Sequence, residues 1–105
     1  AGNLMFISGQ IPLNPKTGDL VSDSIEEQAK QVLKNVQSIC EAAGYSLDDI
    51  VKISIFLTDL SNFGIVNDVM KEYFSEPYPA RATVEVSALP LGVNVEIEAI
   101  VLIND

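Results

Sequence analysis

The residues from Ser24 to Gly44 carry the strongest structural signal in the sequence, because they mark both ends of one amphipathic helix. Ser24 and Glu27 have the spacing of a capping box, in which each side chain binds a backbone N–H at the start of a helix. Gly44 suits the left-handed conformation that ends many helices. Between these ends, apolar residues recur at three- and four-residue steps: Ile25, Ala29, Val32, Leu33, Val36, Cys40 and Ala43. The pattern predicts a helix over residues 25–43 with one buried face.

Strand patterns lie on both sides of this helix. Residues 4–8 predict a strand that runs into Gly9 and a turn-rich stretch, and residues 19–21 predict a short strand that pairs back onto it. After the helix, residues 46–50 predict a single capped turn. Residues 51–57 alternate between apolar and other side chains, which predicts a third strand.

The second half of the chain predicts another helix and two more strands. The helix follows Asp59 and ends before Pro77 and Pro79, because proline cannot continue a helix. Its apolar side consists of Phe63, Val66, Val69, Met70, Tyr73 and Phe74. Residues 82–89 and 94–103 predict two closing strands, which we expect residues 90–93 to join as a hairpin.

This order of elements predicts a single α+β domain over residues 1–105, with one sheet and two helices packed on one of its faces. Residues 97–103 are apolar on both sides of their strand apart from Glu98, which suits burial on both faces of the sheet. Two helices cover only one face. We therefore expect self-association to bury the other face, since monomers rarely expose large apolar patches.

Composition excludes several classes of function. The chain has 15 acidic and 6 basic residues, a formal charge of −9 and no histidine, and its six cations are scattered along the sequence. Binding to nucleic acid or to an anionic membrane is therefore disfavoured, because both need clustered cations. With no histidine and one cysteine, a single chain lacks the ligands for a zinc site and the base for a histidine-activated nucleophile. We therefore expect no metal site, and any chemistry must depend on carboxylates, hydroxyls, backbone groups, the one arginine or an unseen cofactor.

Cys40 is the lone cysteine, so the chain forms no internal disulfide and gives no reason to expect an oxidising compartment. No apolar run approaches the roughly 20 residues of a membrane span, and no secretory signal is visible. These observations predict a cytoplasmic protein. Because an apolar segment begins at Leu4, almost at the start, we also expect native residues to precede Ala1.

Arg81 is the first candidate for a site residue, since it is the only arginine and follows a proline-rich turn at the start of a strand. A guanidinium group binds a carboxylate through two parallel charge-assisted hydrogen bonds. Pro77 and Pro79 stiffen the approach to this position. The alternative is an ordinary surface salt bridge to one of the many acids.

Glu96 and Glu98 lie two residues apart on the last predicted strand and therefore share a face. Such acids are either part of a solvated face or partly buried acids that serve in proton transfer. In the expected hairpin, Arg81 lies opposite Leu102, roughly 20 Å from Glu96 at about 3.3 Å per residue. Arg81 and Glu96 then cannot meet within one chain, and a shared site needs a second subunit.

Three weaker candidates remain. Ser8 and Gly9 offer a hydroxyl and an approachable backbone for an anion, although a simple turn explains them equally well. Asn67 lies in the middle of the second helix, where it is either a site residue or an exposed polar residue. Cys40 lies on the apolar face of the first helix and is expected to serve in packing.

Taken together in order, several segments resemble the reactive intermediate deaminase family (RidA, also called YjgF) along essentially the whole chain. They are Phe6-Ile7-Ser8-Gly9-Gln10-Ile11-Pro12, Thr17-Gly18, Asp49-Ile50-Val51-Lys52, Phe56-Leu57-Thr58-Asp59-Leu60, Pro79-Ala80-Arg81 and Val95-Glu96-Ile97-Glu98-Ala99-Ile100. The resemblance implies a chorismate-mutase-like α+β fold that assembles as a homotrimer with sites between subunits. It also implies cofactor-free hydrolysis of 2-imino acids, such as 2-iminobutanoate and 2-iminopropanoate, to 2-keto acids and ammonia.

The resemblance also implies roles for individual residues. Arg81 would bind the substrate carboxylate, Ser8 and the backbone at Gly9 would help to seat the ligand, and Asn67 would lie near the cleft. Glu96 resembles the acid that activates water and protonates the departing nitrogen. The family commonly has a cysteine where this chain has Thr83, which can donate a hydrogen bond but excludes thiol chemistry there. Family members also begin with a further strand and a tyrosine that closes the pocket.

Two classes of function follow from these observations. The first is an enzyme, a 2-iminobutanoate/2-iminopropanoate deaminase. The second is a non-catalytic trimer that uses the same cleft to bind 2-keto acids or other small carboxylates. A chaperone is a weaker third alternative, and a ribonuclease fits poorly with a charge of −9.

Overall fold

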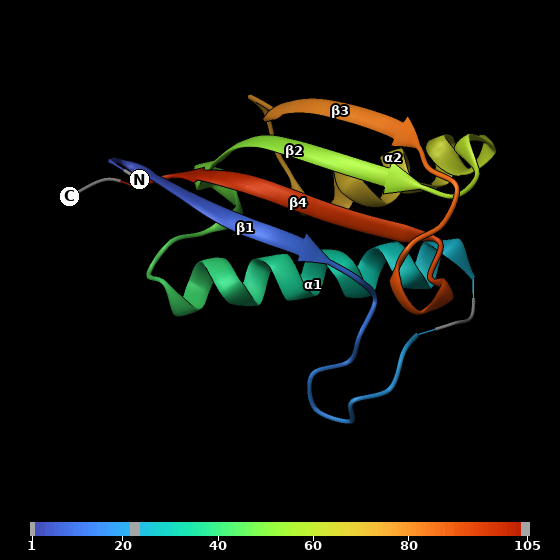
Figure 1. The fold of residues 1–105 in the computed structure, drawn as a ribbon. Helices are drawn as coiled ribbons and strands as arrows, with labels where there is room; N and C mark the ends of the chain where they lie inside the picture. The colour runs from blue at the N-terminus through green and yellow to red at the C-terminus, as the bar shows by residue number, and fades with distance from the viewer. Residues whose placement is uncertain (1, 22–23, 104–105) are drawn as a thin grey trace.

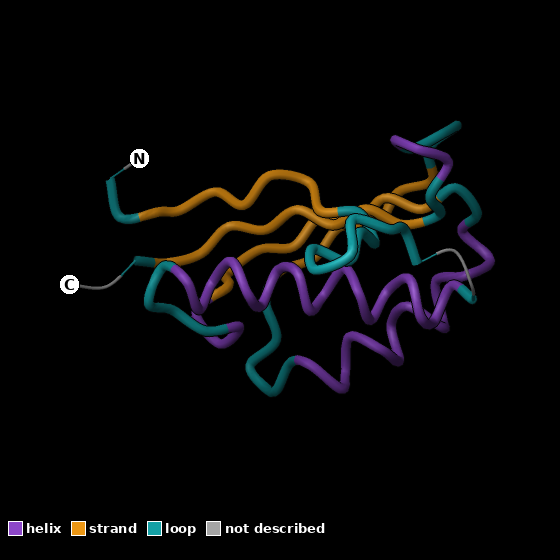
Figure 2. The backbone as a smooth tube through the Cα atoms, turned by 90° about the horizontal axis from the view of Figure 1, so that it is seen from below, coloured by secondary structure: helices purple, strands orange, loops and turns teal. Residues whose placement is uncertain are grey.

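Four strands form one mixed sheet, and both α-helices pack on the same face of it (Figures 1 and 2). The protein is described by a computed structural model, which covers residues 2–21 and 24–103. The strands are β1 (Leu4–Gln10), β2 (Ile50–Leu57), β3 (Ala80–Glu85) and β4 (Val95–Leu102), arranged in the order β1-β4-β2-β3. β4 pairs antiparallel with β1 and β2, and β3 pairs parallel with β2. The predicted α+β class and mixed sheet are confirmed.

Helix α1 (Ile25–Ala42) has the ends that the sequence predicts. The Ser24 hydroxyl accepts a hydrogen bond from the Glu27 backbone N–H at 3.1 Å. At the other end Gly44 has a φ of +87°, which lets the N–H of Tyr45 donate back to the carbonyl of Cys40 at 2.8 Å. The apolar face of the helix, including Cys40, is buried against the sheet.

Helix α2 (Phe63–Tyr73) follows a 3₁₀ turn, Leu60–Asn62, that Asp59 caps by accepting from the Ser61 N–H. The hydroxyl and the backbone N–H of Ser61 both donate hydrogen bonds to the Asp59 carboxylate, which lowers its pKa. The buried side of α2 packs on α1 and the sheet. The capped turn that the sequence predicts around residues 46–50 is also present, as a 3₁₀ turn over Leu47–Asp49.

The predicted hairpin between the last two strands is wrong. β3 does not pair with β4, because β2 lies between them. The chain runs from β2 through α2 to β3, and strands joined by a helix in this way pair in parallel. The predicted strand over residues 19–21 is reduced to a single antiparallel bridge between Leu13 and Leu20.

The two faces of the sheet differ sharply in burial. Alternate residues of β2 and β4 are buried under the helices: Ile53, Ile55, Leu57, Val95, Ile97, Ala99 and Val101. The opposite face carries side chains that remain accessible, including Phe6 at 61% exposure, and no helix of the described residues covers it. We call it the open face. None of the helices in the described ranges is long and apolar enough to cross a membrane.

A polar network around the buried side chain of Gln28 fixes the start of β4. Gln28 of α1 is 4% exposed, and its side-chain amide both donates to the Asn94 side chain and accepts from the Asn94 backbone N–H, each at 3.1 Å. The Asn94 amide group in turn donates to the Thr58 hydroxyl at 3.0 Å. These bonds tie α1 and the end of β2 to the residue just before β4, two positions from Glu96.

Leu91 is an exposed residue held in an unfavourable conformation, which predicts a stabilising substitution. It has a φ of +57° in the turn before β4 and is 72% exposed. Leucine pays about 1–2 kcal/mol in this left-handed region, whereas asparagine tolerates it. We expect Leu91→Asn to raise the free energy of unfolding by about 0.5–1 kcal/mol, measured by urea denaturation at fixed protein concentration. Leu91→Ala is the control, because alanine has no polar side chain that favours the left-handed conformation. Equal denaturation midpoints for the two variants would contradict the claim that Leu91 is strained.

Candidate active site

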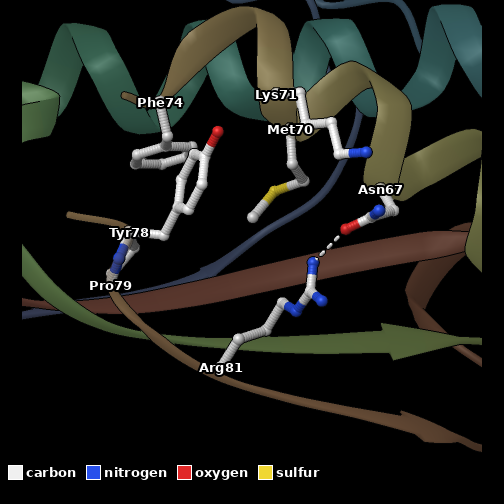
Figure 3. Close-up of a pocket in the computed structure, with 7 residues that line it drawn as sticks. All are labelled: Asn67, Met70, Lys71, Phe74, Tyr78, Pro79 and Arg81. Atoms are coloured by element: carbon white, nitrogen blue, oxygen red, sulfur yellow. Dashed lines mark hydrogen bonds between the residues drawn. The ribbon is translucent and has the colours of Figure 1, made fainter. Parts of the chain in front are cut away.

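Arg81 extends from the edge strand β3 toward helix α2. Its guanidinium group donates a hydrogen bond to the side-chain oxygen of Asn67 (Figure 3). Its Cζ atom lies 5.2 Å from the centre of the Phe63 ring. The latter distance is typical of a cation–π contact. Among residues 2–21 and 24–103, Arg81 forms no salt bridge, so the alternative of an ordinary surface ion pair is not realised there. Several guanidinium N–H groups remain available for a ligand.

The helical spacing of α2 explains how Arg81 is held. Phe63, Asn67 and Lys71 are four residues apart and therefore lie on one side of the helix. Phe63 and Asn67 give Arg81 its ring contact and its hydrogen bond, and Lys71 follows one turn later. This stripe on α2 orients the only arginine of the chain.

A pocket of about 390 Å³ lies beside this arginine, between the second half of α2, the connection to β3 and β3 itself. We call it the Arg81 pocket. Its lining residues are Asn67, Met70, Lys71, Phe74, Tyr78, Pro79 and Arg81. No acidic side chain of residues 2–21 and 24–103 lines it, so it combines two cations with an apolar wall. Such a pocket suits a small acidic molecule.

Glu96 and Gly9 form a second cluster, on the open face. β1 carries a bulge in which Ser8 and Gly9 together oppose the single residue Glu98 of β4. The bulge brings the Gly9 backbone so close to the Glu96 carboxylate that a Cβ atom at Gly9 would overlap it. Glu96 is half-buried, whereas Ser8 is exposed. We call Ser8, Gly9 and Glu96 the open-face cluster.

A shallow hollow of about 370 Å³ continues from Ser8 over the open face. It is lined by Phe6, Ile7, Ser8, Lys52, Ser54, Glu98, Ala99 and Ile100. The hollow mixes an exposed aromatic ring with charged and hydroxyl groups. It is thus suited to contact another protein surface as well as a small molecule.

The structure keeps Arg81 and Glu96 apart within one chain, but not for the reason expected from the sequence. Arg81 is in register with Ile53 of β2, which is in register with Ala99 of β4. Two strand spacings and three residues along β4 separate its Cα from that of Glu96 by roughly 14 Å. Arg81 also points to the helix face, whereas Glu96 belongs to the open face. Arg81 and Glu96 therefore do not meet within one chain, as expected, while the register with Leu102 and the distance of roughly 20 Å based on it are wrong.

Among the described residues, Thr83 and Cys40 belong to neither the Arg81 pocket nor the open-face cluster. Thr83 lies two residues from Arg81 on the same face of β3, but its hydroxyl oxygen is covered and has no hydrogen-bond partner among the described residues. Thr83 is therefore beside the Arg81 pocket without opening into it. Burial raises the pKa of the Cys40 thiol, which fits the packing role that the sequence predicts.

Sequence reasoning missed Phe63, Met70, Lys71, Phe74 and Tyr78 as site residues. Phe63, Met70 and Phe74 were expected in the apolar face of the helix. Nothing in the sequence linked them to Arg81, because their nearness depends on the pairing of β3 with β2. One available signal was the four-residue spacing of Phe63, Asn67 and Lys71, which puts an aromatic, an amide and a cation on one stripe. The described residues contain no group of three histidine, cysteine or acidic side chains that would hold a metal ion.

The contact between Gly9 and Glu96 predicts a selective loss of activity in Gly9→Ala. The new methyl group would displace the Glu96 carboxylate, which lies at the free end of a flexible side chain, while the backbone stays in place. We expect the rate of the reaction proposed below to fall at least about tenfold, because catalysis depends on the position of this acid. Gly64→Ala is the control, since nothing lies within 4 Å of a Cβ atom there. Equal rates for both variants would contradict a role for the Gly9 contact.

Comparisons with known proteins find relatives along nearly the whole chain. The family model described as Endoribonuclease L-PSP matches residues 1–103. A RutC family protein of Pyrococcus horikoshii is 54% identical over 100 residues, which cover 95% of this chain and 79% of that protein. The human 2-iminobutanoate/2-iminopropanoate deaminase is 45% identical over 98 residues, covering 93% of this chain and 72% of the human protein.

A solved structure gives the same result for the fold. RidA from the Antarctic bacterium Psychrobacter superimposes with a TM-score of 0.94 and 51% identity, covering 98% of this chain and 83% of that one. The resemblance seen in the sequence motifs is thereby confirmed. The chain belongs to the Endoribonuclease L-PSP family, the family of the RutC and RidA proteins.

Proposed function

We propose that this protein is a cofactor-free deaminase that hydrolyses 2-imino acids, such as 2-iminobutanoate and 2-iminopropanoate, to 2-keto acids and ammonia. The observation that carries the proposal is Arg81. It is the only arginine in an acidic chain, it is oriented by Asn67 and Phe63, and it faces a pocket with no acidic lining residue among those described. A human relative at 45% identity bears the name of this activity.

The proposed catalytic site lies between two subunits of a homotrimer. One subunit contributes the Arg81 pocket, and the next contributes the open-face cluster with Glu96. This assembly accounts for two features of the single chain, namely the separation of Arg81 from Glu96 and the exposed Phe6 on an open sheet face. Burying that face in an oligomer would remove an apolar surface from water.

In the proposed mechanism Arg81 binds the carboxylate of the imino acid through charge-assisted hydrogen bonds and so fixes the neighbouring imine carbon. The Glu96 carboxylate takes a proton from water as the water oxygen forms a bond to that carbon. That proton passes to the nitrogen as the C=N double bond becomes a single bond, which gives a carbinolamine. The carbinolamine hydroxyl then gives its proton, through Glu96, to the amino nitrogen, the carbon–nitrogen single bond breaks, and ammonia leaves as the C=O bond of the 2-keto acid forms. Ser8, the Gly9 backbone and Asn67 position the ligand, and Thr83 donates a hydrogen bond if its hydroxyl turns toward the cleft.

The second candidate is a trimer that binds 2-keto acids without turnover. The same Arg81 pocket favours it, since carboxylate binding needs no general base. A nucleic-acid substrate is disfavoured, because the six cations are scattered and the net charge is −9. The absence of a membrane or nucleic-acid partner, and the cytoplasmic location expected from the sequence, stay predictions.

Release of ammonia from an imine made in solution separates the two candidates. A threonine dehydratase generates 2-iminobutanoate, which also decays without a catalyst. We expect the protein to accelerate ammonia release in this coupled assay above the uncatalysed rate. If the protein binds 2-ketobutyrate but leaves the rate of ammonia release unchanged, the binding function is supported and the deaminase function is wrong.

A further inference from the structure

The Arg81 pocket has two chemically different ends. Arg81, Asn67 and Lys71 supply charged and amide groups at one end, whereas Met70, Phe74 and Tyr78 supply a thioether and two aromatic rings at the other (Figure 3). In this view the Met70 side chain lies between the two rings and the Arg81–Asn67 pair. A ligand that fills the pocket therefore has an acidic end and an apolar end.

The exposure of the apolar end shows how a ligand would be enclosed. Met70 and Phe74 are each 6% exposed and form a fixed floor, while Tyr78 is 54% exposed and stands over it. Pro77 and Pro79 flank Tyr78 and restrict the backbone that carries it. An exposed tyrosine held over an apolar floor loses solvent contact when an apolar group enters beneath it, which favours binding.

The pocket is larger than the smallest substrates. Pockets of about 300–1,000 Å³ hold ligands of drug size, and this one measures about 390 Å³. When Arg81 holds the carboxylate of 2-iminopropanoate, its methyl group is too short to fill the apolar end. A branched or aromatic side chain fills it.

We propose that Met70, Phe74 and Tyr78 form the side-chain specificity pocket of this protein and select 2-imino acids with large apolar side chains over those with a methyl or ethyl group. This inference rests on the proposed function for the identity of the reacting group. The acidic end of the substrate binds Arg81, the apolar end lies under Tyr78, and the imine carbon between them faces the open side of the pocket. Lys71 is at the rim and contributes only to the attraction of anions.

Binding of stable 2-keto acids tests this selectivity without requiring turnover. We would titrate the full chain with pyruvate, 4-methyl-2-oxopentanoate, phenylpyruvate and 2-oxoglutarate and measure each Kd by calorimetry. We expect 4-methyl-2-oxopentanoate to bind at least about tenfold more tightly than pyruvate, since one added methylene in a fitted pocket changes discrimination by about 10-fold or more. Tyr78→Ala should lower this ratio several-fold, whereas Tyr78→Phe keeps the ring and should preserve it. Because Tyr78 is exposed, neither substitution removes core packing.

Each outcome separates the inference from the function on which it rests. Equal affinity for pyruvate and the larger keto acids, or an unchanged ratio in Tyr78→Ala, overturns the specificity pocket even if iminobutanoate is hydrolysed. Tightest binding of 2-oxoglutarate that is lost in Lys71→Ala overturns it in favour of a dicarboxylate pocket. If the ratio of keto-acid affinities changes as expected, but the protein accelerates ammonia release from no imine, the specificity pocket is supported and the enzymatic function is wrong.

Discussion

Replacing Arg81 with alanine is expected to lower the rate of 2-iminobutanoate hydrolysis by about 100-fold or more in the coupled ammonia assay. Each hydrogen bond between charged groups contributes about 1.5–3 kcal/mol, and the guanidinium group makes two to one carboxylate. Binding of 2-ketobutyrate should weaken in parallel, because the carboxylate is common to substrate and product. The fold should persist, since Arg81 is exposed on an edge strand and holds only Asn67 and Phe63.

The matched variant Arg81→Lys keeps the charge but loses the fork that binds both carboxylate oxygens. We therefore expect it to lie between the wild type and Arg81→Ala in both rate and affinity. Circular dichroism of each variant shows whether the fold is kept. If a folded Arg81→Ala protein releases ammonia at the wild-type rate, the enzymatic assignment of this pocket is wrong.

Replacing Glu96 with glutamine separates chemistry from binding. General acid–base catalysis contributes about 10²–10⁴-fold in rate, so kcat should fall by a factor in this range. The affinity for 2-ketobutyrate should stay within a few-fold of the wild type, because the amide keeps the shape of the side chain and Arg81 still holds the carboxylate. Initial rates over a range of imine concentrations and calorimetric titration with 2-ketobutyrate give the two quantities.

Glu98→Gln is the control for this prediction. Glu98 lies on the same strand and the same face as Glu96, two residues away, and it is exposed. It carries the same charge, but the atoms that a Cβ atom at Gly9 would meet first belong to Glu96 and not to Glu98. A loss of activity as large in Glu98→Gln as in Glu96→Gln would point to the charge of the open face rather than to proton transfer by one acid. Equal loss of rate and affinity in Glu96→Gln would point to a structural role.

The helices were predictable from the sequence because their signals are local. Ser24 and Gly44 mark the ends of α1 within a few residues of the groups they bind, and Asp59 caps the turn that leads into α2. The alternation of β2 was equally clear, since every second residue faces the helices. These features depend on backbone geometry near each residue and need no knowledge of the rest of the chain.

The pairing of the last two strands was not predictable in the same way. β3 and β4 are neighbours in sequence, but a strand partner is chosen by burial across the whole sheet. β2 and β4 bury Ile53, Ile55 and Ile97 completely or nearly so, whereas β3 is accessible along most of its length and takes the edge. The α2 crossover then sets β3 parallel to β2.

The sheet topology also determined which site residues could be predicted from the sequence. Arg81 and Glu96 were recognisable by residue type and by motif, and Gly9 by its place after a strand. The apolar wall of the Arg81 pocket was not, because Met70 and Phe74 also satisfy the pattern of an ordinary buried helix face. Their nearness to Arg81 follows only from the parallel placement of β3.

The central claim is that Arg81 of one subunit and Glu96 of another act in one site, and mixing two inactive variants tests it most directly. Arg81→Ala and Glu96→Gln proteins would be unfolded together in equal amounts and refolded, so that their subunits assort at random. A site shared by two subunits is then intact in about one quarter of cases, one half for each residue. We predict recovery of up to about a quarter of the wild-type ammonia release, and a refolded mixture as inactive as either variant alone would contradict the account.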